Sequence, residues 1–200
     1  MIDADDCNAS IYLVGDALDD LSRRAMLGRA TSIDWHVSAS RQGAAPTRSI
    51  GTLDLALDRL DDGFAGVFPH RIGDAAYAGL SVDRVVVARY VAGDRFDVHT
   101  DAPWARDERT CSFFSVLLYL NDDFTGGETF FPELRRTIRP RAGTALVFGH
   151  RHRHCGCPVI AGTKFVLHLF AIYSFSDANG LPISDIVREM TRTGRHYAEA

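Results

Sequence analysis

The chain has 200 residues, 46% of them hydrophobic, and its 26 acidic and 22 basic residues give a net charge of −4 at pH 7. This length and composition suit a single globular domain over residues 1–200. The small negative charge, without a long run of either sign, argues against nucleic acid or an anionic membrane as a partner. The acidic start "MIDADDCNAS" and the lack of a membrane-length apolar window predict a cytoplasmic protein.

Residues 1–80 are predicted to form a mainly helical support region. The segment "GDALDDLSRRAMLGRA", residues 15–30, has Asp16 as a candidate N-cap and apolar residues at helical spacing. A second helix is expected over "TLDLALDRLDDG", residues 52–63, ending at Gly63. Between the two helices, "ASRQGAAPTRS" is typical of a loop.

From residue 81 to 175 the pattern changes to short strands rich in Val, Phe, Tyr and Leu. The strands are expected in "VDRVVVARYV", "SFFSVLLYLN", "TALVFGH" and "KFVLHLFAIYS". A final helical segment, "LPISDIVREMTRTG", falls within residues 176–200. Strands without intervening helices favour a jelly roll or barrel, so the fold class is mainly β with flanking helices (α+β).

The segment "RFDVHTD" contains the first candidate metal ligands, His99 and Asp101. Residues i and i+2 of an extended chain point to the same side, so this imidazole and carboxylate can chelate one ion. An isolated His-x-Asp pair is more often part of a surface turn. A metal site therefore needs a third ligand.

Candidates for the third ligand lie in "VFGHRHRHCGCPV", where His150, His152 and His154 alternate along one predicted strand face. Only one of them need bind. A structural zinc site with Cys155 and Cys157 is an alternative, but paired zinc cysteines usually have two or more residues between them. Two histidines and one carboxylate are instead the ligand set of non-haem Fe(II) oxygenases, which leaves open positions for a 2-oxo acid and dioxygen.

Lys164 is the only lysine in the chain. It begins the strand "KFVLHLFAIY", which is apolar on both faces and is an unfavourable place for an unpartnered ammonium group. If 2-oxoglutarate is the co-substrate, its far carboxylate needs a fixed cation inside the barrel. Lys164 can supply that cation, although a lysine at the start of a strand can also lie at the surface. The four cysteines are predicted to be free thiols.

Four segments in unbroken order resemble the 2-oxoglutarate- and Fe(II)-dependent dioxygenases, specifically the prolyl-4-hydroxylase-like branch. They are "RYVAGDRFDVHTD", "LLYLNDDFTGGETFF", "IRPRAGTALVFGH" and "HCGCPVIAGTKFVLHLFAIY". The resemblance implies a double-stranded β-helix, a distorted and cupin-like jelly roll. It also implies Fe(2+) held by His99, Asp101 and His154, with 2-oxoglutarate and O2 as co-substrates.

The same resemblance assigns a co-substrate site. Lys164, ten residues after the third iron ligand, is implied to pair with the far carboxylate of 2-oxoglutarate, and Tyr119 to donate a hydrogen bond to it. Tyr90 matches another pocket tyrosine, although both tyrosines can instead be core aromatics, and Thr129 can line the same pocket. His168 stands where many relatives have arginine, so it can contact co-substrate or substrate, or it can fill the core.

The resemblance predicts a hydroxylase, but the substrate lies outside its motifs. Trp104 and Arg106 follow the metal motif in a loop whose charge and aromatic character suit a small zwitterion such as a free amino acid. The expected substrate is therefore a small molecule, and the expected state is a monomer or homodimer. Hydroxylation of a protein side chain of the prolyl type is the enzymatic alternative, and a non-catalytic, cupin-like metal-binding protein is the alternative of another class.

Overall fold

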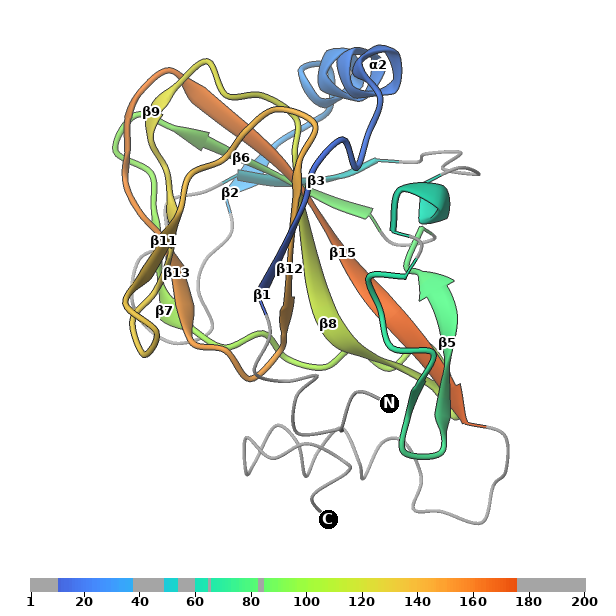
Figure 1. Ribbon diagram of the computed structural model, residues 1–200. Helices are drawn as coiled ribbons and strands as arrows, with labels where there is room; N and C mark the ends of the chain where they lie inside the picture. The colour runs from blue at the N-terminus through green and yellow to red at the C-terminus, as the bar shows by residue number, and fades with distance from the viewer. Residues whose placement is uncertain (1–10, 38–48, 54–59, 65, 83–84, 176–200) are drawn as a thin grey trace.

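The computed structural model describes residues 11–37, 49–53, 60–64, 66–82 and 85–175. Two antiparallel sheets that pack face to face dominate it (Figure 1). The predicted mainly β fold class is confirmed. Within these ranges no helix is both long and apolar enough to cross a lipid bilayer.

The larger sheet has nine strands among the described residues. Its order is β1 (Ile11–Val14), β12 (Ala145–Gly149), β8 (Thr110–Tyr119), β15 (Thr163–Phe175), β6 (Val85–Val91), β3 (Ser49–Leu53) and β2 (His36–Val37). The far half of β15 also pairs with β5 (Ala75–Leu80), and β5 pairs with β4 (Arg71–Ile72). The strands predicted from the four apolar segments are β6, β8, β12 and β15, which form the centre of this sheet.

The smaller sheet covers one end of the larger one and carries both histidines of the metal motif, His99 and His154. Its order is β11 (Arg136–Ile138), β10 (Thr129–Phe131), β13 (His154–Gly156) and β7 (Phe96–His99). A short ladder of β14 (Val159–Ala161) and β9 (Thr125–Gly126) lies beside it. Phe131 of the smaller sheet packs in one cluster with Tyr119, Phe148 and Val166 of the larger sheet, so the interior of the barrel lies between the two sheets.

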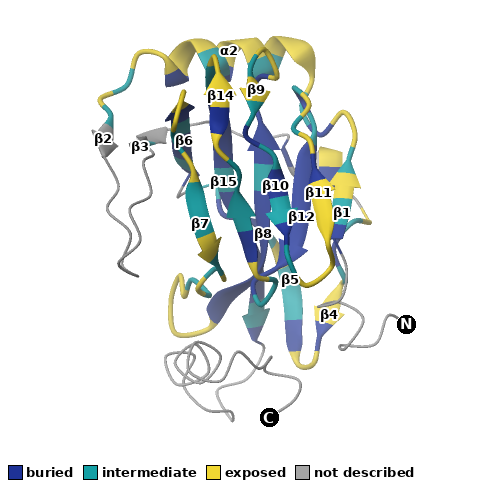
Figure 2. Ribbon diagram, turned by 90° about the vertical axis from the view of Figure 1, so that its left-hand side faces the viewer, coloured by how far each residue is buried: buried dark blue, intermediate teal, exposed yellow. Residues whose placement is uncertain are grey.

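Alternation along β15 separates the core from the site. Leu167 and Leu169 point to an apolar cluster that also contains Met26 and Ala30, whereas the residues of the opposite face, Lys164, Val166 and His168, point toward the smaller sheet. Figure 2 shows that buried residues concentrate along β8, β12 and β15, while the outer surface of the N-terminal helix is exposed. The strand therefore anchors the core with one face and builds the site with the other.

The region before residue 81 is less helical than predicted. Where the structure describes it, it contains one α-helix, α2 (Asp20–Ala30), one 3-10 turn, η1 (Asp61–Phe64), and strands β1 to β5. The predicted N-cap at Asp16 is wrong. Asp19 caps α2 instead, because its side chain accepts the Ser22 N–H at 2.9 Å, while a hydrogen bond from Leu18 N–H to a distant carbonyl keeps the preceding turn outside the helix.

The other predicted helices fall mainly outside the described residues. In the segment 52–63, residues 54–59 are not described, the first two residues belong to β3, and Gly63 lies within η1. The segment 176–200 is also outside the described residues. The division into one domain with helical ends, the cytoplasmic location and the oligomeric state stay predictions.

Gly126 and Gly93 form a matched pair that tests how tightly the β9–β14 ladder is packed. Both have left-handed backbone angles, with φ of 76° and 91°, so an alanine at either position is strained. A Cβ at Gly93 meets open space, whereas a Cβ at Gly126 collides with the Pro158 carbonyl oxygen. We expect Gly93→Ala to lower the free energy of unfolding by about 1–2 kcal/mol, from backbone strain alone.

Gly126→Ala should lower it by at least about 1 kcal/mol more, because the ladder must open to admit the methyl group. Urea denaturation of both variants measures the difference. If both variants lose the same free energy of unfolding, the ladder adjusts freely to the added methyl group, and Gly126 is needed only for the backbone angles of its turn.

Candidate metal centre and co-substrate site

Three side chains from the two halves of the metal motif converge at one point. In the antiparallel pair of β7 and β13, His99 lies directly opposite His154, and their ring centroids are 4.3 Å apart. Asp101 follows β7 by two residues, with its Oδ1 3.4 Å from His99 Nε2 and its Oδ2 3.9 Å from His154 Nε2. The three ligand atoms lie within 4.8 Å of one another, so one ion can contact all of them.

Backbone carbonyls fix the orientation of both rings. The Nδ1 atom of His99 is 2.7 Å from the Asp97 carbonyl oxygen, and that of His154 is 3.0 Å from the His152 carbonyl oxygen. A carbonyl oxygen only accepts, so each Nδ1 carries the proton and each Nε2 keeps its lone pair toward Asp101. Metal-binding histidines have this arrangement, because the carbonyl fixes the tautomer and makes the ring a better ligand.

The charge state of the cluster also suits a divalent cation. Burial lowers the pKa of His154 to about 4, so its imidazole is neutral at pH 7. Burial raises the pKa of Asp101, but the positive charge that the neighbouring rings of His154, His168 and His99 carry when protonated, with a hydrogen bond from His99, outweighs burial and holds the pKa of this carboxyl well below its usual range. Neutral imidazoles and an ionised carboxylate are the two-histidine, one-carboxylate donor set that binds non-haem Fe(II).

The three alternating histidines do not share one strand face as predicted. A turn follows β12, with a hydrogen bond from His152 N–H to the Gly149 carbonyl oxygen, and the chain enters β13 only at His154. The His150 ring lies between two serines of β8, and the His152 ring packs edge-on against Phe131. The turn therefore places only the last of the three histidines at the metal position.

The two cysteines after His154 stay outside the cluster. Cys155 and Cys157 are free and half-buried, and burial raises the pKa of both thiols. Among the residues that the structure describes, the group with metal-binding geometry is the histidine and aspartate triad, without a sulfur ligand. The geometry therefore does not support the alternative of a zinc site built on Cys-Gly-Cys.

Lys164 is buried inside the barrel, as its sequence context suggested. Its ammonium group donates a hydrogen bond to the Gly127 carbonyl oxygen at 2.7 Å and lies 5.3 Å and 5.4 Å from the ring centroids of Tyr90 and Tyr119. No described acidic side chain forms an ion pair with it. Burial lowers its pKa to about 8, although nearby Cys157 and Glu128 partly offset the shift. This is an environment in which a bound carboxylate would restore the lost solvation.

Two further contacts hold the Lys164 end of the site. The Tyr119 hydroxyl and Thr129 Oγ1 are 3.1 Å apart, and both residues are buried. Asn121, which the sequence interpretation missed, forms hydrogen bonds to the backbone of the residues on both sides of the lysine. Its Oδ1 accepts the Phe165 N–H at 2.8 Å, and its Nδ2 donates to the Thr163 carbonyl oxygen at 2.7 Å. A lone amide in "YLND" next to an apolar strand was the available signal.

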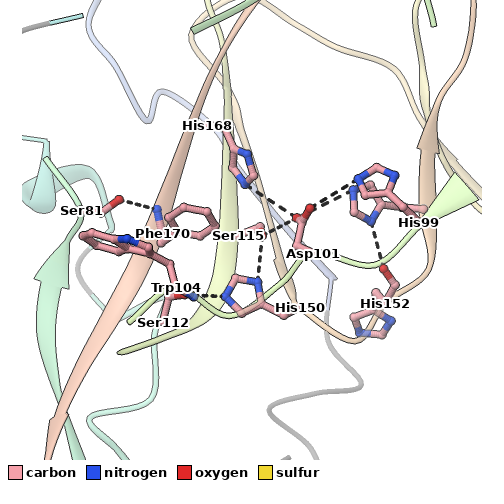
Figure 3. Close-up of polar contacts among 11 residues, drawn as sticks. Ser81, His99, Asp101, Trp104, Ser112, Ser115, His150, His152, His168 and Phe170 are labelled. Carbon is pink, nitrogen blue, oxygen red and sulfur yellow. Dashed lines mark hydrogen bonds and ion pairs between the residues drawn. The ribbon is translucent and has the colours of Figure 1, made fainter. Parts of the chain in front are cut away.

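His168 lies at the metal end of the site. Its Nε2 is 3.7 Å from Asp101 Oδ2 (Figure 3). Since Lys164 and His168 are four residues apart on one face of β15, their Cα atoms are separated by about 13 Å. The face between the two residues thus connects the metal cluster with the buried cation, as a co-substrate that touches both would require.

The loop after the metal motif folds back onto β8. Trp104 stacks on Phe170, with ring centroids 6.1 Å apart, and its backbone pairs with Ser112. Arg106 is exposed, and its N–H donates to the Thr110 carbonyl oxygen. The loop therefore forms a rim beside the cluster that is fixed by hydrogen bonds, and its charged residues, such as Arg106, are exposed.

The comparisons with known proteins agree with this geometry. Residues 85–172 match the family model of the 2OG-Fe(II) oxygenase superfamily. Human prolyl 4-hydroxylase subunit alpha-1 is 30% identical over 48% of this chain and 21% of its own length. The chain spans less than half the length of the curated relatives that it matches.

Solved structures agree on the fold. A viral collagen prolyl hydroxylase from Paramecium bursaria Chlorella virus-1 superposes with a TM-score of 0.62 at 18% identity, over 84% of this chain and 98% of the other. A prolyl hydroxylase from Trichoplax adhaerens, in complex with a hypoxia inducible factor peptide fragment, gives 0.64 at 19% identity, over 87% and 88%. The predicted double-stranded β-helix is thereby confirmed. Residues 85–172 of the chain thus match the 2OG-Fe(II) oxygenase superfamily, and among its members the chain resembles the prolyl 4-hydroxylases.

Proposed function

We propose that this chain is an Fe(II)- and 2-oxoglutarate-dependent hydroxylase whose substrate is a side chain in a peptide, with proline as the first candidate. The proposal rests mainly on one observation: the oriented triad of His99, Asp101 and His154 and the buried ammonium of Lys164 lie inside the same barrel. A simple metal-binding jelly roll would have no need of a buried cation at a distance from its ligands. The binding-protein alternative is therefore the weaker one.

The residues of the proposed site divide into iron ligands, groups that bind 2-oxoglutarate, and apolar walls. His99, Asp101 and His154 hold the iron on one side and leave the other positions open. Lys164 pairs with the far carboxylate of 2-oxoglutarate, and the Tyr119 hydroxyl lies beside it. Iron, 2-oxoglutarate and O2 together supply the oxidation of an unactivated C–H bond, with succinate and carbon dioxide as by-products. The apolar walls, which include Phe131 and Phe148, exclude water.

The substrate class follows from the relatives more than from the composition of the loop. A small molecule such as a free amino acid is the expectation from Trp104 and Arg106, but the relatives named above are prolyl hydroxylases, and one of them is in complex with a peptide. The peptidyl alternative is better supported. Trp104 and Arg106 on the rim are in place to contact such a peptide.

A first experiment tests the iron site and the substrate together. Anaerobic protein should give the visible charge-transfer band of a chelated 2-oxo acid with Fe(II) and 2-oxoglutarate, and His154→Ala should not. With O2, proline-containing peptides should gain one oxygen atom by mass spectrometry, matched by succinate. Hydroxylation of free amino acids alone would reject the peptidyl substrate, and a band that persists in His154→Ala would reject the iron site.

Lys164→Met should separate the binding role of this lysine from any role in stability. An amine with a folded-state pKa of about 8 and an unfolded value of about 10.4 opposes folding at pH 7 by an amount on the order of 3 kcal/mol. Methionine fills similar space without charge, so we expect the free energy of unfolding to rise by about 1–3 kcal/mol while 2-oxoglutarate no longer stabilises the protein. Because the pKa is depressed, this gain should shrink as pH rises from 8 to about 10.4. A loss of stability at pH 7 would contradict this account.

Binding of 2-oxoglutarate should weaken at alkaline pH. The ammonium is protonated below its pKa of about 8, so affinity is constant there and falls by about tenfold per pH unit above it. Pyruvate is the control ligand, because it chelates through the same 2-oxo acid group but has no far carboxylate for Lys164 to bind. Anaerobic titrations between pH 7 and 9.5 measure both. A parallel loss of both affinities would place the titration at the metal instead.

A further inference from the structure

Asp101 is supported by a chain of buried hydrogen bonds that the proposed reaction does not by itself require. Ser115 Oγ lies 2.6 Å from Asp101 Oδ2 and 3.0 Å from His150 Nδ1. On the other side of the ring, His150 Nε2 lies 2.8 Å from Ser112 Oγ, which is 2.9 Å from the backbone N of Trp104. Figure 3 shows the chain running from the rim loop, through the imidazole, to the carboxylate.

The two ends of this hydrogen-bonded chain set the direction of three of its four bonds. The Ser115 hydroxyl donates its one hydrogen to Asp101 Oδ2, so it must accept from His150 Nδ1–H. At the other end, the Trp104 N–H can only donate to Ser112 Oγ. The Ser112 hydroxyl is then free to donate to His150 Nε2, so a neutral imidazole satisfies both serines in one orientation.

This chain of hydrogen bonds lies in a buried and mainly apolar part of the larger sheet. Ser112 and Ser115 have no exposed surface, and His150 has 3%. Both serines belong to β8, whose sequence "TCSFFSVLLY" is otherwise almost wholly apolar. Buried hydroxyls stabilise a strand less than apolar side chains of equal size unless each is hydrogen-bonded. The hydrogen bonds to His150 and Asp101 are therefore the best explanation for serines at these two positions.

A β-bulge brings the two serines to one side. Residues three apart on a regular strand point to opposite faces. Along β15, however, Ala171 pairs with Phe114 and the next residue, Ile172, pairs with Ser112, so Phe113 is an extra residue in β8. The bulge turns Ser112 to the face that Ser115 occupies. Without it, only one serine could reach the His150 ring.

We propose that His150 is a positioning residue for the metal centre: through Ser115 it fixes the Asp101 carboxylate in its ligating orientation, while its contact with Ser112 joins the ring to the rim loop at Trp104 without reaching the carboxylate. The inference rests on the proposed iron site and deepens it. Contacts of this kind to a ligating carboxylate are typically worth about 10–100-fold in metal affinity.

Metal affinity, measured without turnover, tests the proposal. Apo protein is titrated anaerobically with Co(II) alone, and the visible absorption of the bound ion gives both the affinity and the symmetry of the site. We expect Ser115→Ala and His150→Phe each to weaken Co(II) binding by about tenfold or more and to change the band shape. His150→Asn should remain within about threefold of the wild type, because its amide N–H replaces the Nδ1–H donor.

Ser112→Ala is the matched control, since Ser112 is as buried as Ser115 and touches the same ring but not Asp101. It should lower the melting temperature about as much as Ser115→Ala while changing Co(II) affinity by less than about threefold. A purely structural role for the chain predicts instead that affinity follows stability in all four variants, which would overturn the proposal.

A double variant decides whether His150 acts through Ser115. If it does, Ser115→Ala combined with His150→Phe binds Co(II) no more weakly than Ser115→Ala alone. Losses that multiply to about a hundredfold, or wild-type binding by His150→Phe, would overturn the proposal. Failure of the iron site itself is distinguishable, because His154→Ala would then bind Co(II) as well as the wild type does.

Discussion

The register between β7 and β13 is the constraint on which the site depends. It sets His99 directly opposite His154, so two imidazoles from segments 55 residues apart, by subtraction of their numbers, share one side of a two-strand ladder. A slip of one residue would turn His154 to the other face and remove the cluster. Packing of the His154 ring against Phe148, 4.5 Å between centroids, ties this ladder to the larger sheet.

The barrel interior then places two charges where apolar side chains would be more stable. Lys164 is buried and Asp101 is mostly buried, and each has hydrogen-bond partners but no direct ion pair with the other in the described chain. Such groups are costly in the free protein and favourable once an oppositely charged ligand arrives. In the proposed function, a cation binds at one end of the site and a carboxylate at the other. The free protein has a lower free energy of unfolding because it keeps these charged groups for binding.

The side chains around Asp101 connect metal binding to the rim. His168 and Phe170 of β15 lie on the same side as the Ser115 and His150 contacts, and Trp104 stacks on Phe170. The loop that follows the metal motif is therefore supported by the same strands that orient Asp101.

The sequence by itself determined the four central strands, the triad, the buried lysine and the resemblance to the 2OG-Fe(II) oxygenases, because alternating apolar residues and short ligand motifs are local patterns. Its helical interpretation of the first 80 residues was too broad, since strands such as β1 and β5 form only by pairing with β12 and β15. Only the tertiary structure decided that His150 lies between two serines and His168 beside Asp101. Those contacts depend on a bulge at Phe113 and on the register of strands distant in sequence, which no local pattern encodes.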